Sequence, residues 1–258
     1  MRELSPKSIR IKLINPNTTV SMTQTMVRCA QGVVGPRTEV VGVSPQMGPP
    51  SIESHYDEAL SLPGLLAEVR EGERAGCNGY VIACFGDPGV DAARELVRGP
   101  VIGIAEAAMH TASLIAPSFS VVTTLGRTCG MAWRLAERTG MKRFCRNVRA
   151  VEIAVLELEN PASNASRRIT EECRRALAED RSEAIVLGCA GMVDLCGAIS
   201  REIGAPVVEG VTAAVKLVEA LVTLGLGTAK RGEYASPSPK FYGGMLSGFS
   251  PDDPAASA

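Results

Sequence analysis

The stretch GYVIACFGDPG, residues 79–89, is an apolar run that ends at Cys84 and then changes abruptly to glycine and proline. About a hundred residues later, EAIVLGCAGM, residues 183–192, has the same outline around Cys189. A short apolar run bounded by glycine is typical of a buried strand in a parallel sheet. The recurrence indicates that the chain uses one structural plan twice.

Short β-branched runs alternate with amphipathic segments through residues 9–225. We expect strands at 9–15, 39–45, 79–84, 100–104, 119–124, 148–153, 183–189 and 206–210. We expect helices at 21–33 (behind a Ser cap), 57–76 (interrupted at Pro63), 90–97, 105–116, 129–140, 165–180, 195–204 and 211–225. This alternation predicts an α/β fold with mainly parallel sheets flanked by helices.

An alignment of Cys84 with Cys189 also aligns the helix and strand that follow, with one residue gained before the proline. We therefore predict two βα lobes related by a pseudo-twofold, with the active site in the cleft between them. The first lobe spans 9–117 plus the closing helix, about 211–225, and the second spans 118–210. Residues 230–258 are rich in Pro, Ser and Gly, which predicts an extended, partly disordered C-terminal arm.

The composition narrows the class of protein. The 258 residues are 45% apolar, so a sizeable core is expected. The formal net charge is −1, which argues against nucleic acid or an anionic membrane as the main partner. Aromatic residues make up 4%, too few for platforms that stack bases. The N-terminus lacks the apolar core of a signal peptide, and no apolar run approaches the ~20 residues of a membrane span. We expect a cytoplasmic protein.

The cysteines are expected to be thiols rather than disulfides or metal ligands. The chain has 8 cysteines without a Cys-x-x-Cys pair, and only 2 histidines, so its sequence predicts no metal site. It has no Walker-type loop or Gly-x-Gly-x-x-Gly element behind a strand, so no nucleotide site is predicted either. Most of these thiols are expected to be small apolar packing residues.

Cys84 and Cys189 are the exceptions because each lies at the carboxyl end of a predicted strand, where α/β proteins bind ligands. A nearby helix N-terminus lowers the pKa of a thiol, so either side chain could be a thiolate near neutral pH. Two such groups on opposite sides of a small molecule could remove a proton from a carbon beside a carbonyl and return one to the other face. The alternative is that both are packing residues.

Several neighbours could bind the substrate. Backbone N–H groups at Phe85, Gly86, Ala190 and Gly191 are candidate donors to the enolate that forms when the proton leaves. The amide of Asn15 could bind a ring carbonyl or N–H, although the NPNT turn (15–18) could simply cap the next helix. Thr123 and Thr124 end the equivalent strand of the second lobe, and the same two interpretations apply.

These stretches resemble the PLP-independent aspartate/glutamate racemase superfamily, and within it the hydantoin racemases. The resemblance rests on INPNT (14–18), SIESHYDEA (51–59), VIACFGDPG (81–89), GPVIGIAEAAMH (99–110), SVVTTL (120–125) and AIVLGCAGM (184–192). It implies cofactor-independent, metal-free racemisation of 5-monosubstituted hydantoins, with Cys84 and Cys189 as the paired acid and base. It also implies a homo-oligomer that works beside a hydantoinase and a carbamoylase.

The alternatives within this fold are an allantoin racemase, a maleate-isomerase type of chemistry and arylmalonate decarboxylation. Decarboxylation needs only one cysteine, so the pair favours racemisation. A further alternative is a two-lobed protein that binds a small cyclic imide without turning it over.

Overall fold

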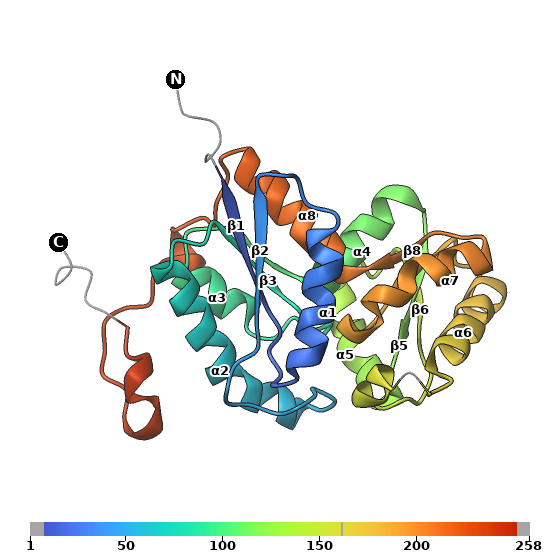
Figure 1. Ribbon diagram of the computed structural model, residues 1–258, viewed down its shortest axis with the longest axis horizontal. Coiled ribbons are helices and arrows are strands. Elements are labelled where there is room, and N and C mark those ends of the chain that lie inside the picture. Colours follow the sequence, from blue (N-terminus) through green and yellow to red (C-terminus); the bar gives the residue numbers. More distant parts are fainter. Residues whose placement is uncertain (1–7, 161, 252–258) are drawn as a thin grey trace.

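The computed structural model describes residues 8–160 and 162–251 as two sheets flanked by helices (Figure 1). The first sheet has the order β2-β1-β3-β4, with β1 Ile9–Ile14, β2 Thr38–Val43, β3 Gly79–Ile82 and β4 Val101–Gly103. The second has the order β6-β5-β7-β8, with β5 Phe119–Thr123, β6 Cys145–Ala150, β7 Ala184–Leu187 and β8 Val207–Glu209. All pairings are parallel, so the predicted α/β class and its duplicated plan are confirmed.

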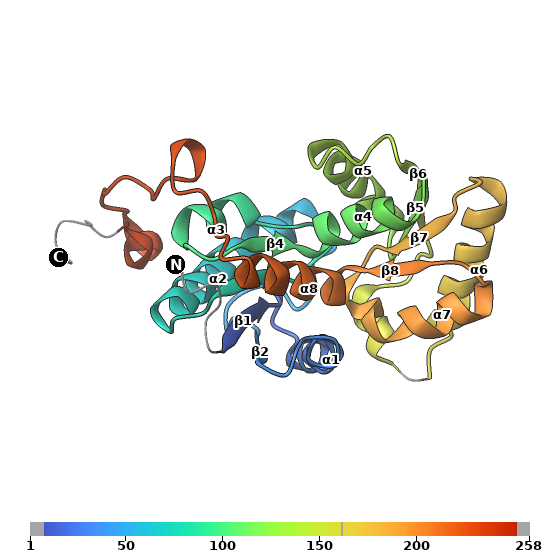
Figure 2. The same cartoon turned by 90° about the horizontal axis from the view of Figure 1, so that it is seen from above.

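A helix follows each strand, as Figures 1 and 2 show. In the first lobe these are α1 Val20–Gln31, α2 His55–Arg74, α3 Val90–Leu96 and α4 Ile104–Ile115. The strands of the second sheet are followed by α5 Cys129–Arg138, α6 Ala165–Glu179, α7 Cys196–Ile203 and α8 Gly210–Thr223. Short 3₁₀ segments are η1 Gly126–Thr128, η2 Val155–Glu159, η3 Ala190–Leu195, η4 Gly232–Tyr234 and η5 Gly244–Phe249.

The strands that carry the two cysteine loops are buried along their whole length, as is β5. Every residue of β3 and β7 is buried, as expected of a strand with helices on both faces. One core cluster is continuous across both sheets and the helices between them. Two smaller clusters lie outside it, one under α2 and α3 and one under α6 and α7. The core therefore joins the lobes instead of stopping at the cleft.

Helices α4 and α8 cross between the lobes, and each packs mainly on the sheet of the other (Figure 2). α8 follows β8 but packs against β1, β3 and β4, whereas α4 follows β4 and packs against β7 and β8. The two helices approach closely at Gly210, where a Cβ atom would overlap the carbonyl oxygen of Ile104. Glycine is required there by the crossing and not by an unusual backbone angle.

Among the predicted features, one helix interruption, one helix cap and the position of one strand were wrong. α2 continues through Pro63, because the carbonyl that loses its helical partner is that of Ala59, an exposed residue that water can reach. α1 begins at Val20, so Ser21 lies inside its first turn and is not the cap. The strand predicted at 148–153 is observed at Cys145–Ala150, an edge strand whose Arg and Asn side chains conceal the pattern.

The C-terminal segment lies along the first lobe with no long helix or strand (Figure 1). Lys230 donates from Nζ to the carbonyl of Arg94 at 2.9 Å, and the Tyr234 hydroxyl lies 3.0 Å from Oδ1 of Asp91. The side chains of Phe241 and Met245 are fully exposed. The end of the arm predicted at 230–258 falls on residues 252–258, which lie outside the described part of the chain.

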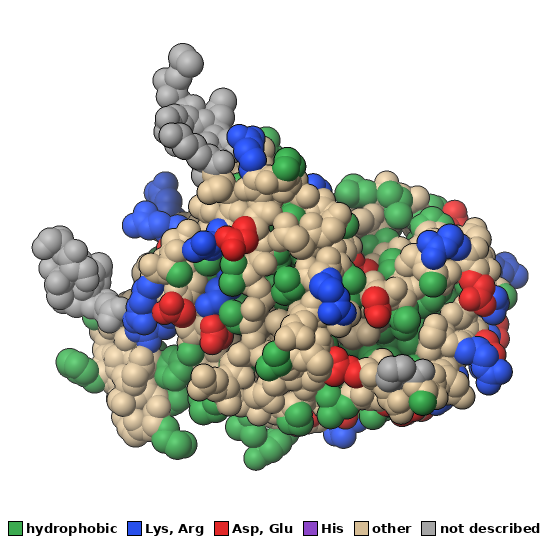
Figure 3. Space-filling model, viewed as in Figure 1, with side chains coloured by type: hydrophobic (Ala, Val, Ile, Leu, Met, Phe, Trp, Pro, Cys, Tyr) green, Lys and Arg blue, Asp and Glu red, His purple; other side chains and the backbone are tan. Residues whose placement is uncertain are grey.

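The surface carries both signs of charge. On the face shown in Figure 3, basic and acidic side chains are interspersed and apolar side chains lie among them. Within residues 8–160 and 162–251, no helix is long and apolar enough to cross a membrane.

Candidate active site

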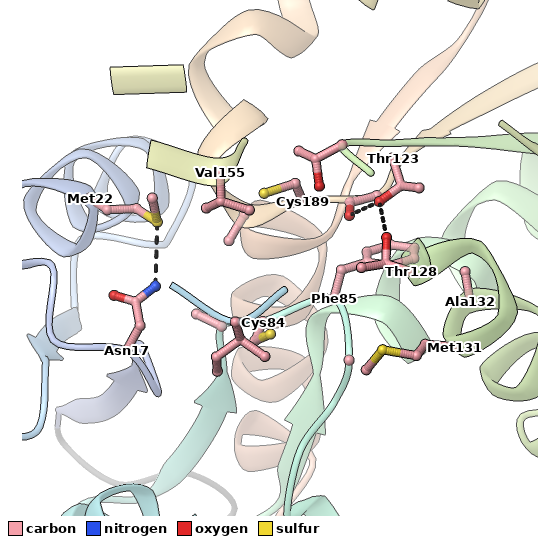
Figure 4. Close-up of a pocket in the computed structure, with 16 residues that line it drawn as sticks. Asn17, Met22, Cys84, Phe85, Thr123, Thr128, Met131, Ala132, Val155 and Cys189 are labelled. Atoms are coloured by element: carbon pink, nitrogen blue, oxygen red, sulfur yellow. Dashed lines mark hydrogen bonds between the residues drawn. The ribbon is translucent and has the colours of Figure 1, made fainter. Parts of the chain in front are cut away.

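Cys84 and Cys189 occupy equivalent places in the two lobes. Cys84 lies two residues beyond the end of β3 at Ile82, and Cys189 lies two residues beyond the end of β7 at Leu187. Both strands are central in their sheets, so their carboxyl ends open toward the cleft. The two side chains line one pocket, from opposite sides (Figure 4). It contains about 620 Å³ of empty space, including the part open to solvent.

The pocket is formed by both lobes and is mostly apolar. The predicted site residues that line it are Cys84, Phe85, Gly86, Thr123, Thr124, Cys189 and Ala190. The lining residues that sequence reasoning missed are Asn17, Met22, Ile52, Ala83, Thr128, Met131, Ala132, Val155 and Gly188. None of the lining side chains is charged. Apolar side chains with no motif around them leave no sequence signal beyond ordinary core patterning.

Asn15 is not among the lining residues and is 1% exposed. Its Nδ2 donates to Oδ1 of Asn17 at 2.8 Å and to the hydroxyl of Thr23 at 2.9 Å. Asn17 lines the pocket instead, and its Oδ1 also accepts the N–H of Thr19 at 2.9 Å. These bonds fix the amide so that Nδ2 lies 3.7 Å from Sδ of Met22 (Figure 4). The residue that presents an amide donor to the pocket is therefore Asn17, with Asn15 behind it.

Thr123 lines the pocket, but its hydroxyl donates to the carbonyl of Gly188 at 3.0 Å. It also lies 3.4 Å from the hydroxyl of Thr128 (Figure 4). The bond to Gly188 joins the end of β5 to the loop that carries Cys189. Thr123 therefore supports the second cysteine loop, and Thr128 brings a further hydroxyl to the same wall.

Burial shifts the pKa values of the two pocket thiols upward, against the lowering expected from nearby helix N-termini. Burial raises the pKa of Cys84 to about 12, and the charges of Cys189, Asp87 and Glu58 add to the rise. Burial also raises the pKa of Cys189 to about 11, with a smaller contribution from Glu53. Desolvation of a charged sulfur thus opposes the ionisation that is expected of these thiols near neutral pH.

One backbone N–H group acts on each sulfur. The N–H of Gly86 hydrogen-bonds Cys84 and the N–H of Gly191 hydrogen-bonds Cys189, and each bond lowers the pKa of its thiol. Gly191 itself is absent from the pocket lining and borders the neighbouring groove between α1 and η2. These two donors therefore stabilise the thiolates, a different use from the predicted one at the enolate.

A polar bridge connects the lobes beside the pocket. We define the interlobe bridge as residues 52–55 together with η2, since Ile52 and Val155 both line the pocket. Oε1 of Glu53 accepts the N–H of Val155 at 2.7 Å. Nearby, the hydroxyl of Ser21 donates to Glu159 at 2.6 Å, and Nη2 of Arg134 lies 3.0 Å from Nε2 of His55.

The remaining cysteines fit packing roles. All 8 are free thiols, and Cys145 and Cys173 are buried in core clusters. Among the described residues, no group of three or more His, Cys, Asp and Glu side chains is arranged to hold a metal ion.

Residues 11–218 match the family model described as Asp/Glu/hydantoin racemase. The chain is 49% identical over 229 residues to a hydantoin racemase of Rhizobium meliloti, which spans 89% of this chain and 95% of that protein. It is 44% identical over 241 residues to a hydantoin racemase of Pseudomonas sp. (strain NS671), with 93% and 97% covered. An allantoin racemase structure from Klebsiella pneumoniae matches with a TM-score of 0.93 and 48% identity, covering 95% of this chain and 100% of that one.

Proposed function

The chain belongs to the Asp/Glu/hydantoin racemase family, and on that premise we propose that it interconverts the D and L forms of 5-monosubstituted hydantoins without a cofactor. Its family makes it an isomerase of the racemase type. The observation that carries the proposal is the pair Cys84 and Cys189, which line one pocket from two lobes. A flat ring held between them would present one face of C5 to each sulfur.

The reaction is a two-base proton transfer. The thiolate of one cysteine takes the proton from C5, so an S–H bond forms, the C–H bond breaks and its electron pair moves onto the adjacent carbonyl oxygen. The thiol of the other cysteine then gives its proton to the opposite face of C5, and the carbonyl re-forms. Turnover in one direction leaves the thiol and thiolate exchanged, ready for the opposite isomer.

High thiol pKa values suit this chemistry in one respect and limit it in another. Each unit by which the pKa of a base rises makes proton abstraction easier by about 1.4 kcal/mol and makes the deprotonated form about tenfold rarer at a given pH. The N–H groups of Gly86 and Gly191 offset part of the second effect, because they favour the thiolates. The rate at neutral pH is thus set by a small population of a strong base.

The enolate oxygen needs a donor, since no charged side chain lines the pocket. We assign this role to Nδ2 of Asn17, which donates to the weakly accepting sulfur of Met22. Because Asn15 and the N–H of Thr19 hold its oxygen, the donor is oriented before substrate binds. Such preorganised donors contribute most where water is excluded.

The remaining walls favour an apolar substituent at C5. Met22, Ile52 and Val155 line the pocket where the lobes meet, and Met131 and Ala132 line it from α5. An alkyl or aralkyl group would gain about 25 cal/mol for each Å² that it buries there. The ureido group of allantoin would instead have to replace its bonds to water. Allantoin racemisation is the second candidate, favoured by the likeness to the Klebsiella pneumoniae enzyme.

Enantiopure hydantoins in deuterated buffer test both proposals. We expect optical rotation to decay while deuterium enters C5, faster for benzyl, isopropyl and methylthioethyl substituents than for the ureido group. A faster reaction of the ureido compound would favour allantoin racemase. Retention of rotation and of C5–H in all four compounds would refute both substrates.

A further inference from the structure

Helices α4 and α8 each begin at a buried carboxylate, but the two carboxylates come from different parts of their lobes. In the internal alignment, Asp87 is the third residue after Cys84, and Met192 is the third after Cys189. Conversely, Gly103 precedes α4 where Glu209 precedes α8. Each crossing helix therefore begins at a buried carboxylate, but the first lobe takes it from the cysteine loop and the second takes it from the cap position of the helix itself.

In the first lobe this carboxylate binds the helix and the cysteine loop together. Asp87 is 2% exposed, and its two oxygens accept the N–H groups of Ala105 at 2.9 Å and Glu106 at 2.8 Å. Its own N–H donates to the carbonyl of Cys84 at 2.9 Å. Gly103 makes room, because a Cβ atom there would overlap the Asp87 carboxyl group.

The backbone at Asp87 is in the left-handed region, with φ at 46°. Such a conformation costs a residue other than glycine of the order of 1 kcal/mol and is retained where the surroundings impose it. Aspartate and asparagine tolerate it better than most residues. The Asp87 side chain, which is bound to the start of α4, thus holds the turn after Cys84 in place.

The second lobe lacks this connection. Glu209 accepts the N–H groups of Val211 at 2.6 Å and Thr212 at 2.9 Å, within its own helix start. The Cys189 loop is closed by the N–H of Met192, which donates to the Cys189 carbonyl at 3.1 Å, while the Met192 side chain is buried in the outer core. In the second lobe, apolar packing of Met192 therefore holds the cysteine loop, whereas in the first lobe the hydrogen bonds of Asp87 hold it.

We propose that Asp87 is a positioning residue that fastens the Cys84 loop to the N-terminus of α4 and so sets where this sulfur lies in the pocket. The inference concerns the same site as the proposed function and rests on it for its kinetic consequence. Asp87 also acts on the Cys84 sulfur through its charge. Asp87 raises the pKa of Cys84, as do Cys189 and Glu58, whereas the N–H of Gly86 lowers it.

The charge of Asp87 is set by its own surroundings. Burial raises its pKa to about 7, the carboxylate of Glu106 raises it further, and the N–H groups of Ala105 and Glu106 and the charge of Arg138 lower it. Above this pH the ionised Asp87 disfavours a thiolate at Cys84. The two thiols therefore have different surroundings, since Asp87 raises the pKa of Cys84 and Glu53 raises that of Cys189.

The test compares Asp87→Asn with Glu209→Gln, which alters the equivalent cap outside the cysteine loop. Iodoacetamide at pH 8.5, followed by peptide mapping, measures each thiol without any substrate. We expect Asp87→Asn to speed alkylation of Cys84 by at least about threefold, because the charge of Asp87 disfavours the thiolate that iodoacetamide attacks, and to leave Cys189 unchanged. Glu209→Gln should change neither rate. Wild-type rates at Cys84 in Asp87→Asn would overturn the proposal.

Racemisation kinetics give the second readout. A misplacement of about 1 Å can cost about 10²-fold, so kcat should fall about a hundredfold in Asp87→Asn while KM stays within about threefold. The double variant Asp87→Gly/Gly103→Glu copies the second lobe, and should recover thermal stability relative to Asp87→Gly without recovering kcat. Recovery of kcat would show that Asp87 acts only as a helix cap, and would refute its role in positioning the Cys84 sulfur. If wild-type enzyme racemises no hydantoin, the proposed function fails, and the alkylation rates still decide the role of Asp87.

Discussion

The lobes meet in two regions that are built in opposite ways. At the crossing of α4 and α8, an apolar core runs unbroken from one sheet to the other. At the interlobe bridge, contact depends on polar bonds such as Glu53 to Val155 and Ser21 to Glu159. A hydrogen bond contributes about 0.5–1.5 kcal/mol, far less than a shared core. Substrate entry should therefore move the bridge and leave the crossing closed.

Substitution of either pocket cysteine is expected to have the largest effect. Cys84→Ser or Cys189→Ser changes neither the crossing nor the bridge, but it removes an acid or base that hydroxyl cannot replace. We expect racemisation to fall by at least about 10³-fold, measured by polarimetry. Cys77→Ser, a half-buried cysteine outside the pocket, serves as the control and should retain its rate. Near-normal turnover by either pocket variant would disprove the two-base scheme.

The dependence of kcat/KM on pH tests whether burial raises the pKa values of the two pocket thiols. Since burial raises both pKa values to about 11–12, the thiolate grows about tenfold per pH unit, and kcat/KM should rise about a hundredfold between pH 6.5 and 8.5. A flat profile over this range would show that the thiolate is already fully formed below pH 6.5. Stability should change in the opposite direction. An unfolded thiol loses its proton near pH 8.5 and the folded one later, so the free energy of unfolding falls as pH rises above that value.

Gly210→Ala breaks the crossing. The added methyl group must overlap the carbonyl of Ile104 unless α4 and α8 separate. We expect the free energy of unfolding to fall by about 2–3 kcal/mol in urea titrations. Gly197→Ala in α7 is the matched control, because the nearest atom is 3.5 Å away at the end of the flexible Arg201 side chain, and it should stabilise by up to about 1 kcal/mol. Equal effects of the two variants would contradict the close approach.

Glu53→Ala loosens the bridge and should have the smallest effect. It removes the acceptor of the Val155 N–H while keeping both thiols and the crossing. KM should rise severalfold because Ile52 and Val155 border the pocket, and stability should fall by about 1 kcal/mol. Steady-state kinetics with Glu157→Ala, an exposed residue of the same segment, give the comparison. An unchanged KM would mean that the bridge does not shape the pocket.

Much of the fold could be predicted because strand alternation and the repeated cysteine outline are local patterns. The predicted places of Cys84 and Cys189 after central strands follow from the same patterns. Although the closing helix α8 was predicted to belong with the first lobe, the reciprocal packing of α4 on the second sheet has no local signal, since helix periodicity does not say which sheet a helix covers. Pro63 misled the prediction because its cost depends on whether the freed carbonyl is exposed, which only the packing determines.

The site was harder to predict than the fold for a similar reason. Asn15 and Asn17 lie in one short turn, and their order along the chain does not say which side chain reaches the pocket. The direction of the thiol pKa values depends on how much water the folded lobes exclude, a property of the whole assembly. The carboxylate of Asp87 resembles an ordinary turn residue until Gly103 is seen beside it.

The helix exchange also bears on how such a chain could arise. A single repeat that ended after its own last helix would leave part of its sheet uncovered, because the helix that protects that face comes from the other repeat. Two separate copies would cover each other only as a domain-swapped dimer. The linker between Ile115 and Phe119 turns that dimer into one polypeptide, which frees the two cysteine loops to diverge and to take different parts in the proposed reaction.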